Sequence, residues 1–171
     1  SINPILDVTF DGTHIIDGEI VSAKPYIQIM VKDENKYLLM NDIEDTAKIK
    51  VYLKSPSSSS YQYIPFYADG KEILQYIPAN NAQNKCQINY QAELLEDGIY
   101  YLRVEANDKS DNASGSNAFV ISFEVINKSS ITEVFNYPNP FSTRTQFVFT
   151  LTGSEVPTFM KIQILTISGK V

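Results

Sequence analysis

Apolar and polar residues alternate in short segments along nearly the whole chain, and turn-forming residues separate the segments. This period of two is typical of strands with one buried face. No convincing amphipathic helix interrupts it, so the pattern predicts an all-β fold, a sandwich of antiparallel sheets. The expected strands cover residues 5 to 10, 26 to 31, 47 to 53, 61 to 66, 72 to 77, 86 to 92, 99 to 106, 118 to 126, 146 to 151 and 159 to 167.

Turn and proline signals divide these strands into units. Asp69-Gly70 predicts a tight hairpin turn between the strands at 61 to 66 and 72 to 77, because glycine tolerates positive φ. A polar stretch predicts a linker at residues 128 to 135. The YPNPF segment that follows cannot be helical, so we interpret it as a stiff lead-in to a second β domain at residues 136 to 171. The sandwich would then occupy residues 1 to 127.

The stretch EDGIYYLRVEANDKSDN at residues 96 to 112 carries the clearest fold signal. Tyr100 follows an Asp-Gly turn on the inward parity, which is the pattern of a tyrosine corner. The stretch resembles bacterial immunoglobulin-like domains, although Asp111 stands where those domains usually have glycine. The resemblance implies an immunoglobulin-like sandwich. Its predicted interior contains Tyr100, Leu102, Val104, Ile121 and Phe123, whereas Val120 is expected outside.

Composition and charge argue against nucleic-acid binding and membrane insertion. A net charge of −6 without a Lys/Arg cluster argues against nucleic acid as a partner. No apolar run approaches the roughly 20 residues of a membrane helix, so we expect no membrane insertion. The chain begins at Ser1 without an initiator methionine, which suggests a piece of a longer protein.

Catalytic chemistry has little support in the sequence. Cys86 is the only cysteine, so no internal disulfide can form, and it lies on the apolar parity of a strand. We expect it to be a buried small hydrophobic residue. The only histidine, His14, lies far from it in sequence, and a catalytic dyad needs both residues in one cleft. We therefore expect no enzyme activity and no catalytic residues.

One metal site and one aromatic site are candidates. Asp108, Asp111 and Asn112 place hard oxygens on one loop, as calcium requires, and the alternative is a turn whose side chains bond their own backbone. Asp7 and Asp11 could add ligands. The tyrosines are candidates for contact with a glycan or a surface protein, because a phenol has an apolar face and a polar tip; the alternative is cross-strand packing. These tyrosines are Tyr61, Tyr63 and Tyr67.

The last quarter of the chain resembles the start of the C-terminal sorting domains of proteins exported by the type IX secretion system of Bacteroidetes. The segment YPNPF is followed by an alternating strand and then by KIQILTISGKV, in the order found in those domains. The later strands of the family are absent, so the second domain is expected to be truncated. The matching motif residues are Tyr137, Pro138, Asn139, Pro140, Phe141, Gly169 and Lys170.

The whole chain is similar to the non-catalytic tail of gingipain-like cysteine peptidases of that phylum. Asp45-Thr46-Ala47 also resembles the Bacteroidetes O-glycosylation triplet, with Thr46 as acceptor. The resemblance implies a secreted or cell-surface protein whose partners are its parent polypeptide and the secretion machinery.

These observations predict a non-catalytic spacer or stabilising module beside a sorting signal. The alternative is an adhesion module that binds glycan or protein, and a third interpretation is part of a secreted peptidase without chemistry in this fragment. Because unpaired strands at residues 146 to 167 would expose open edges, we also expect that segment to recruit a second copy into a homodimer.

Overall fold

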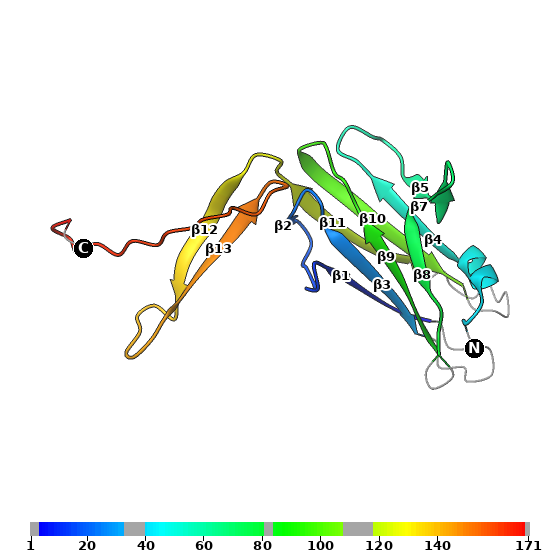
Figure 1. The fold of residues 1–171 in the computed structure, drawn as a ribbon, viewed down its shortest axis with the longest axis horizontal. Helices are drawn as coiled ribbons and strands as arrows, with labels where there is room; N and C mark the ends of the chain where they lie inside the picture. Colours follow the sequence, from blue (N-terminus) through cyan, green and yellow to red (C-terminus); the bar gives the residue numbers. More distant parts are fainter. Residues whose placement is uncertain (1–3, 33–39, 81–83, 108–117, 170–171) are drawn as a thin grey trace.

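The computed structural model describes residues 4–32, 40–80, 84–107 and 118–169. Two main sheets face each other in the described part (Figure 1). The four-stranded sheet has the order β1-β3-β9-β8, formed by Ile5–Phe10, Tyr26–Lys32, Lys85–Gln91 and Leu74–Ile77. The five-stranded sheet has the order β2-β11-β10-β4-β5, formed by Glu19–Val21, Ala118–Val125, Gly98–Ala106, Ile49–Lys54 and Gln62–Ile64.

Three smaller elements complete the described structure. A short ribbon pairs β6 (Tyr67–Ala68) with β7 (Lys71–Glu72), and a longer one pairs β12 (Ser130–Tyr137) with β13 (Gln146–Thr152). The one helical element of the described residues is the 3-10 helix η1 (Ile43–Lys48). No helix among the described residues has the length and apolar character needed to cross a membrane.

The all-β prediction is confirmed. Pairing within the main sheets is antiparallel except between β2 and β11, which run parallel. Between β1 and β4 the chain alternates between the two main sheets, whereas β8 and β9, and likewise β10 and β11, are neighbours within one sheet.

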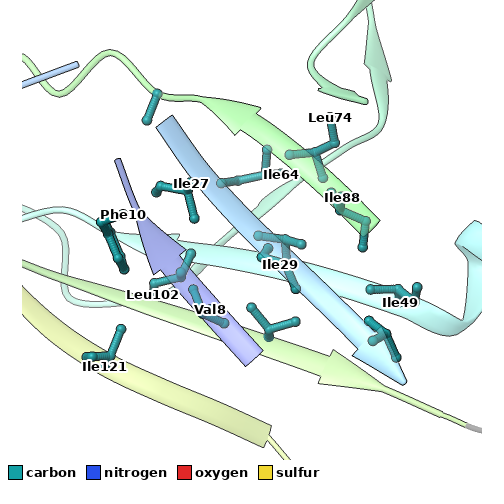
Figure 2. Packing of buried hydrophobic residues seen from close by; sticks show 14 of the residues in the cluster. Val8, Phe10, Ile27, Ile29, Ile49, Ile64, Leu74, Ile88, Leu102 and Ile121 are labelled. Atoms are coloured by element: carbon teal, nitrogen blue, oxygen red, sulfur yellow. The ribbon is translucent and has the colours of Figure 1, made fainter. Parts of the chain in front are cut away.

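The core lies between the two main sheets, and alternation along each strand fills it (Figure 2). On β10 the inward residues Tyr100, Leu102 and Val104 are buried, as predicted. Ile121 and Phe123 of β11 are buried too, whereas 51% of Val120 is exposed. Each fully buried Leu, Ile or Phe side chain stabilises the fold by about 1.5–3 kcal/mol relative to exposure.

Phe123 connects the two layers. Its ring centroid lies 4.9 Å from that of Phe10 in the opposite sheet and 5.7 Å from that of Tyr100 on the neighbouring strand. The Tyr100 hydroxyl accepts from the Glu96 backbone amide at 3.1 Å and lies 3.2 Å from the Glu96 carbonyl oxygen. The predicted tyrosine corner is therefore present, and it ties the core to the turn before β10.

The predicted hairpin at Asp69-Gly70 is only partly correct. The turn forms with positive φ at both residues, but it joins just the short strands β6 and β7. The flanking strands β5 and β8 belong to different main sheets, so they do not pair with each other. The chain passes from one sheet to the other here. The alternation of apolar and polar residues around the turn is the same whether or not the flanking strands pair, so the sequence does not predict this change.

The linker expected at residues 128 to 135 is another correction, because most of it lies in β12. A bulge between Thr132 and Phe135, with Glu133 at φ 53°, interrupts the pairing with β13 and hides the period of two. YPNPF consequently ends a strand: Tyr137 is the last residue of β12, and residues 138–141 begin the loop between β12 and β13, so the segment is not a lead-in to the first strand of a unit.

No strand forms at residues 159 to 167, where the alternating sequence predicts one. The apolar side chains there are exposed, including Phe159 at 79% and Ile164 at 69%. Alternation marks a strand only when a neighbouring strand completes its hydrogen bonds, and no such neighbour occurs among the described residues. Pairing with a second copy through residues 146 to 167 stays a prediction.

A close backbone junction joins the β12–β13 ribbon to the sandwich. The Gly153 amide donates to the Ile126 carbonyl at 2.8 Å, and the Gly153 carbonyl accepts from the Ala23 amide at 3.5 Å. Gly153 has φ +93°, and a Cβ there would lie 2.7 Å from Ser129 Oγ and 3.0 Å from Ser129 Cα. Thr152 is buried beside it, and its hydroxyl donates to the Lys128 carbonyl at 2.6 Å. Only glycine fits at this point of the junction.

Removing the corner hydroxyl should weaken the fold. We expect Tyr100→Phe to lower the free energy of unfolding by about 1 kcal/mol, the net contribution of one hydrogen bond. Chemical denaturation monitored by circular dichroism measures this. Tyr101→Phe is the matched control, because the Tyr101 hydroxyl on the same strand has no hydrogen bond within the described structure. Equal stability of the two variants would contradict a stabilising corner.

Candidate functional site

Two of the three candidate tyrosines lie together on the outer face of the five-stranded sheet. Tyr63 of β5 is 51% exposed and stands opposite Tyr52 of β4, with the two ring centroids 5.7 Å apart in an edge-on arrangement. Tyr61 precedes β5, and its ring lies 5.9 Å from the guanidinium carbon of Arg103 on β10. The tyrosines therefore pack across strands, as the alternative interpretation expects, and still leave part of their surface in solvent.

Cationic side chains stand among these rings. The Lys54 ammonium lies 5.2 Å from the centre of the Tyr101 ring, and Lys54 and Tyr101 are partners in the register of β4 and β10. The Arg103 guanidinium forms an ion pair with Glu105 on the same strand, and 2.5 Å separate Arg103 Nη2 from Glu105 Oε1. We call this cluster the tyrosine–cation face; it consists of Tyr52, Lys54, Tyr61, Tyr63, Tyr101 and Arg103.

Tyr67 does not belong to the tyrosine–cation face. It lies on β6, in the separate short ribbon, and is 59% exposed. Its hydroxyl donates to Glu72 Oε1 at 3.3 Å, and the Glu72 charge beside it raises the pKa of the Tyr67 phenol. Tyr67 thus resembles Tyr63 in its exposure, whereas Tyr61 is only partly exposed.

The proposed glycosylation acceptor, Thr46, lies within η1. Its hydroxyl donates to the Ile43 carbonyl at 2.7 Å, and a glycan on this oxygen would remove that donor. The neighbouring acidic residues begin the helix: the Asp42 side chain accepts from the Glu44 amide, and Asp45 Oδ2 accepts from the Asp42 amide at 2.9 Å. These carboxylates therefore form a capping box.

The predicted calcium loop lies outside the described residues, since Asp108, Asp111 and Asn112 all fall there. The two carboxylates suggested as extra ligands have other partners. Asp7 Oδ1 lies 2.6 Å from His14 Nε2, and Asp11 Oδ1 accepts from the Tyr26 amide at 2.8 Å. Among the described residues, no group of three His, Cys, Asp or Glu side chains is placed to hold a metal ion.

Cys86 is fully buried in the core, as predicted. Burial raises the pKa of its thiol to about 11, so the thiol stays protonated at neutral pH. Its sulfur lies 3.9 Å from Met40 Sδ. His14, by contrast, is largely exposed and contacts Asp7. Cys86 and His14 therefore do not form a dyad.

The sorting-motif residues occupy the ribbon and the segment after it. Tyr137 ends β12 and is 69% exposed, and Phe141 in the following loop is 55% exposed. Thr145 closes the base of this loop by donating to the Pro138 carbonyl at 2.9 Å. Gly169 takes positive φ in a turn and donates to the Thr166 carbonyl, while Lys170 lies outside the described residues.

A cavity of about 810 Å³ separates one face of the ribbon from the chain that follows it. Phe147, Phe149 and Leu151 of β13 line one side, and Val156 and Met160 line the other. The lining is mostly apolar, and its charged members are Glu155 and Lys161.

The carboxylate of Asp97 ties the end of β11 to the Asp-Gly turn. Asp97 Oδ1 accepts from the Asn127 backbone amide at 2.7 Å and from Asn127 Nδ2 at 3.0 Å. Both bonds hold the pKa of Asp97 below its ordinary value, and the bond from the backbone amide has the larger effect. Asp17 holds β11 in a similar way, because its Oδ1 accepts from the Ser122 amide and hydroxyl, which lowers its pKa too.

Comparison with protein-family models and with curated proteins found no match to this chain. The candidate sites above therefore stand on the residues and their geometry.

The Asp97 bond should make stability depend on acid pH. Because its pKa is lower in the folded state than the ordinary 3.8, the stabilisation is present above 3.8 and is lost as the pH falls through the folded value. We expect Asp97→Asn to melt at a lower temperature than wild type at neutral pH and to approach wild type in acid. Thermal melts across this pH range measure it. Asp69→Asn, in an exposed turn, is the control; a gap that does not narrow in acid would contradict the assignment.

Proposed function

We propose that this chain is a non-catalytic spacer and stabilising module within a larger exported or surface-attached protein. The observation that carries the proposal is the path of the chain through the sandwich. Strand β1 begins at the end far from the β12–β13 ribbon, and β11 leaves at the opposite end, where the ribbon starts (Figure 1). A module of this kind separates what lies before it from what lies after it by its own length.

The junction supports this proposal, because a rigid spacer must also fix the direction in which the chain leaves it. The bonds of Gly153 to Ile126 and Ala23, and that of Asp97 to Asn127, restrain the segment between β11 and β12. A free polar linker would lack these restraints. The ribbon is consequently attached at its base to the end of β11 and to the segment between β2 and β3.

Export is proposed from the resemblance to type IX sorting domains. The ribbon would be the first part of the sorting unit, with YPNPF in its exposed loop, and the sandwich would precede it as a stable folded body. The partners would be the parent polypeptide and the secretion machinery, and the location would be outside the cell or on its surface.

Rigid spacing can be measured as a distance. We expect spin labels at Glu44→Cys on η1 and Ser142→Cys in the ribbon loop to give one narrow distance distribution in pulsed electron resonance. Gly153→Ala should broaden it, because the added Cβ meets Ser129. Gly70→Ala is the matched control: its φ is also positive, +75°, but its Cβ would meet nothing within 4 Å. A broad distribution in the unmodified junction would refute a rigid spacer.

The export part of the proposal needs the whole parent protein in its own cell. We expect deletion of residues 130–169 to stop export, and replacement of residues 5–127 by an unrelated sandwich to leave export intact. Cell fractionation with immunoblotting measures both. Unchanged export after the deletion would exclude a sorting role for the ribbon, and loss of export after the replacement would assign signal content to the sandwich.

A further inference from the structure

The outer faces of the two main sheets have different chemistry. On the four-stranded sheet, amide side chains satisfy one another: Gln87 Nε2 donates to Asn89 Oδ1 at 2.7 Å, and Asn89 Nδ2 donates to Gln75 Oε1 at 3.0 Å. On the five-stranded sheet the corresponding surface is the tyrosine–cation face. Four phenol rings lie there, three on β4, β5 and β10 and one just before β5, edge to face or beside cations.

The phenol hydroxyls of the tyrosine–cation face remain available to a ligand. Within the described structure, Tyr52, Tyr61, Tyr63 and Tyr101 form no side-chain hydrogen bond through their hydroxyls. Tyrosines elsewhere use theirs: Tyr76 donates to the Met40 carbonyl at 2.9 Å, and Tyr100 bonds Glu96. Four free donors on one surface are more than packing requires.

The charge of this face is opposite to that of the protein. The outward positions of β4 and β10 carry three cations, Lys50, Lys54 and Arg103, and one acid, Glu105, whereas the whole chain has a net charge of −6. Glu105 is paired with Arg103, so the acid is already neutralised. Lys50 and Lys54 have no acidic partner among the described residues. A local positive potential on an acidic protein favours an anionic ligand there.

We propose that the tyrosine–cation face binds a carboxylate-bearing polysaccharide, such as a chain of uronic acids. Tyr63 and Tyr61 would stack on the apolar faces of successive sugar rings, and the free phenol hydroxyls would bond sugar hydroxyls. The Lys54 ammonium, held beside Tyr101, would pair with a sugar carboxylate. Arg103 is a positioning residue, because its guanidinium supports the Tyr61 ring while Glu105 occupies one of its nitrogens.

A polysaccharide fits this face better than an acidic peptide does. The backbone groups of β4 and β10 beneath the face are used by the sheet, since β4 pairs with both β10 and β5. An extended peptide is recognised mainly through backbone bonds at an open sheet edge together with side-chain pockets. The sheet has such an edge at β5, but Lys54, Tyr101 and Arg103 stand on the inner strands β4 and β10. Their flat layer of rings, hydroxyls and cationic groups suits a ligand made of stacked rings and hydroxyls.

The test uses the full 171-residue chain and three soluble polymers. Polygalacturonate is the acidic glycan, dextran the neutral glycan, and poly-glutamate the acidic peptide. Isothermal titration calorimetry at low and raised salt measures the affinity. We expect binding to polygalacturonate that weakens with salt, and much weaker binding to the other two polymers.

Variants locate the binding surface. Lys54→Gln and Tyr63→Ala should each weaken polygalacturonate binding about tenfold, the loss of one charge-assisted bond or one stacked ring. Lys71→Gln and Tyr67→Ala are matched controls, because they make the same changes on the β6–β7 ribbon outside the face. The controls should bind as wild type does. Circular dichroism verifies that each variant is folded.

Four results would overturn the proposal. Absence of polygalacturonate binding removes the ligand. Poly-glutamate binding as tight as polygalacturonate binding would show that charge alone is recognised. Dextran binding as tight as polygalacturonate binding would show that the carboxylate is not recognised. Loss of binding in the control variants but not in Lys54→Gln and Tyr63→Ala would place the site elsewhere. None of these outcomes alters the spacer proposal, whose measurement concerns distances alone.

Discussion

The contact on which the rest of this structure depends is the packing of Phe123 between the two layers. Phe123 is fully buried, touches Phe10 across the core and stacks on Tyr100 beside it. Through Tyr100 the stack fixes the turn at Glu96, and through the next residue, Asp97, that turn holds Asn127 at the end of β11. Ile126 then accepts the bond from Gly153 that anchors the ribbon. A continuous path of packing and hydrogen bonds therefore runs from the centre of the core to the base of the ribbon.

The two outer faces show that stability and recognition make different demands on exposed positions. The amides of the four-stranded sheet satisfy each other and leave little for a ligand, whereas the tyrosine–cation face keeps its hydroxyls free while its rings are held by neighbours. Cross-strand packing and ligand binding are therefore compatible uses of the same tyrosines. A ring that is already immobilised loses little side-chain entropy when a ligand stacks on it, which favours binding. The rigid sandwich suits the spacer role for the same physical reason: few groups remain to be ordered.

How much the sequence could predict follows from the range of each interaction. Alternation is set by the geometry of a single strand, so the inward positions of β10 and β11 were predicted correctly, including Val120 on the outside. Sheet membership depends on distant partners, so the separation of β5 from β8 could not be predicted from the Asp69-Gly70 turn. Strand β12 was missed because it covers no core and its bulge breaks the alternation. At the candidate site, the chemistry of the phenol pointed to Tyr61, Tyr63 and Tyr67. The structure brings Tyr101 and Arg103 beside the first two only through the register of β5, β4 and β10, and it places Tyr67 elsewhere.

The ribbon shows why its attachment matters more than its own pairing. A two-stranded sheet is marginally stable in water, and most of this one is exposed, with Val134 at 65% and Phe135 at 52%. Its buried point is Thr152, next to Gly153, where the strand meets the sandwich. The backbone bonds at that point hold one end of the ribbon in place, which reduces the entropy lost when its strands pair. The sandwich thus supplies the stability that the ribbon lacks, and the ribbon can leave its loop and its apolar side chains exposed without losing its fold.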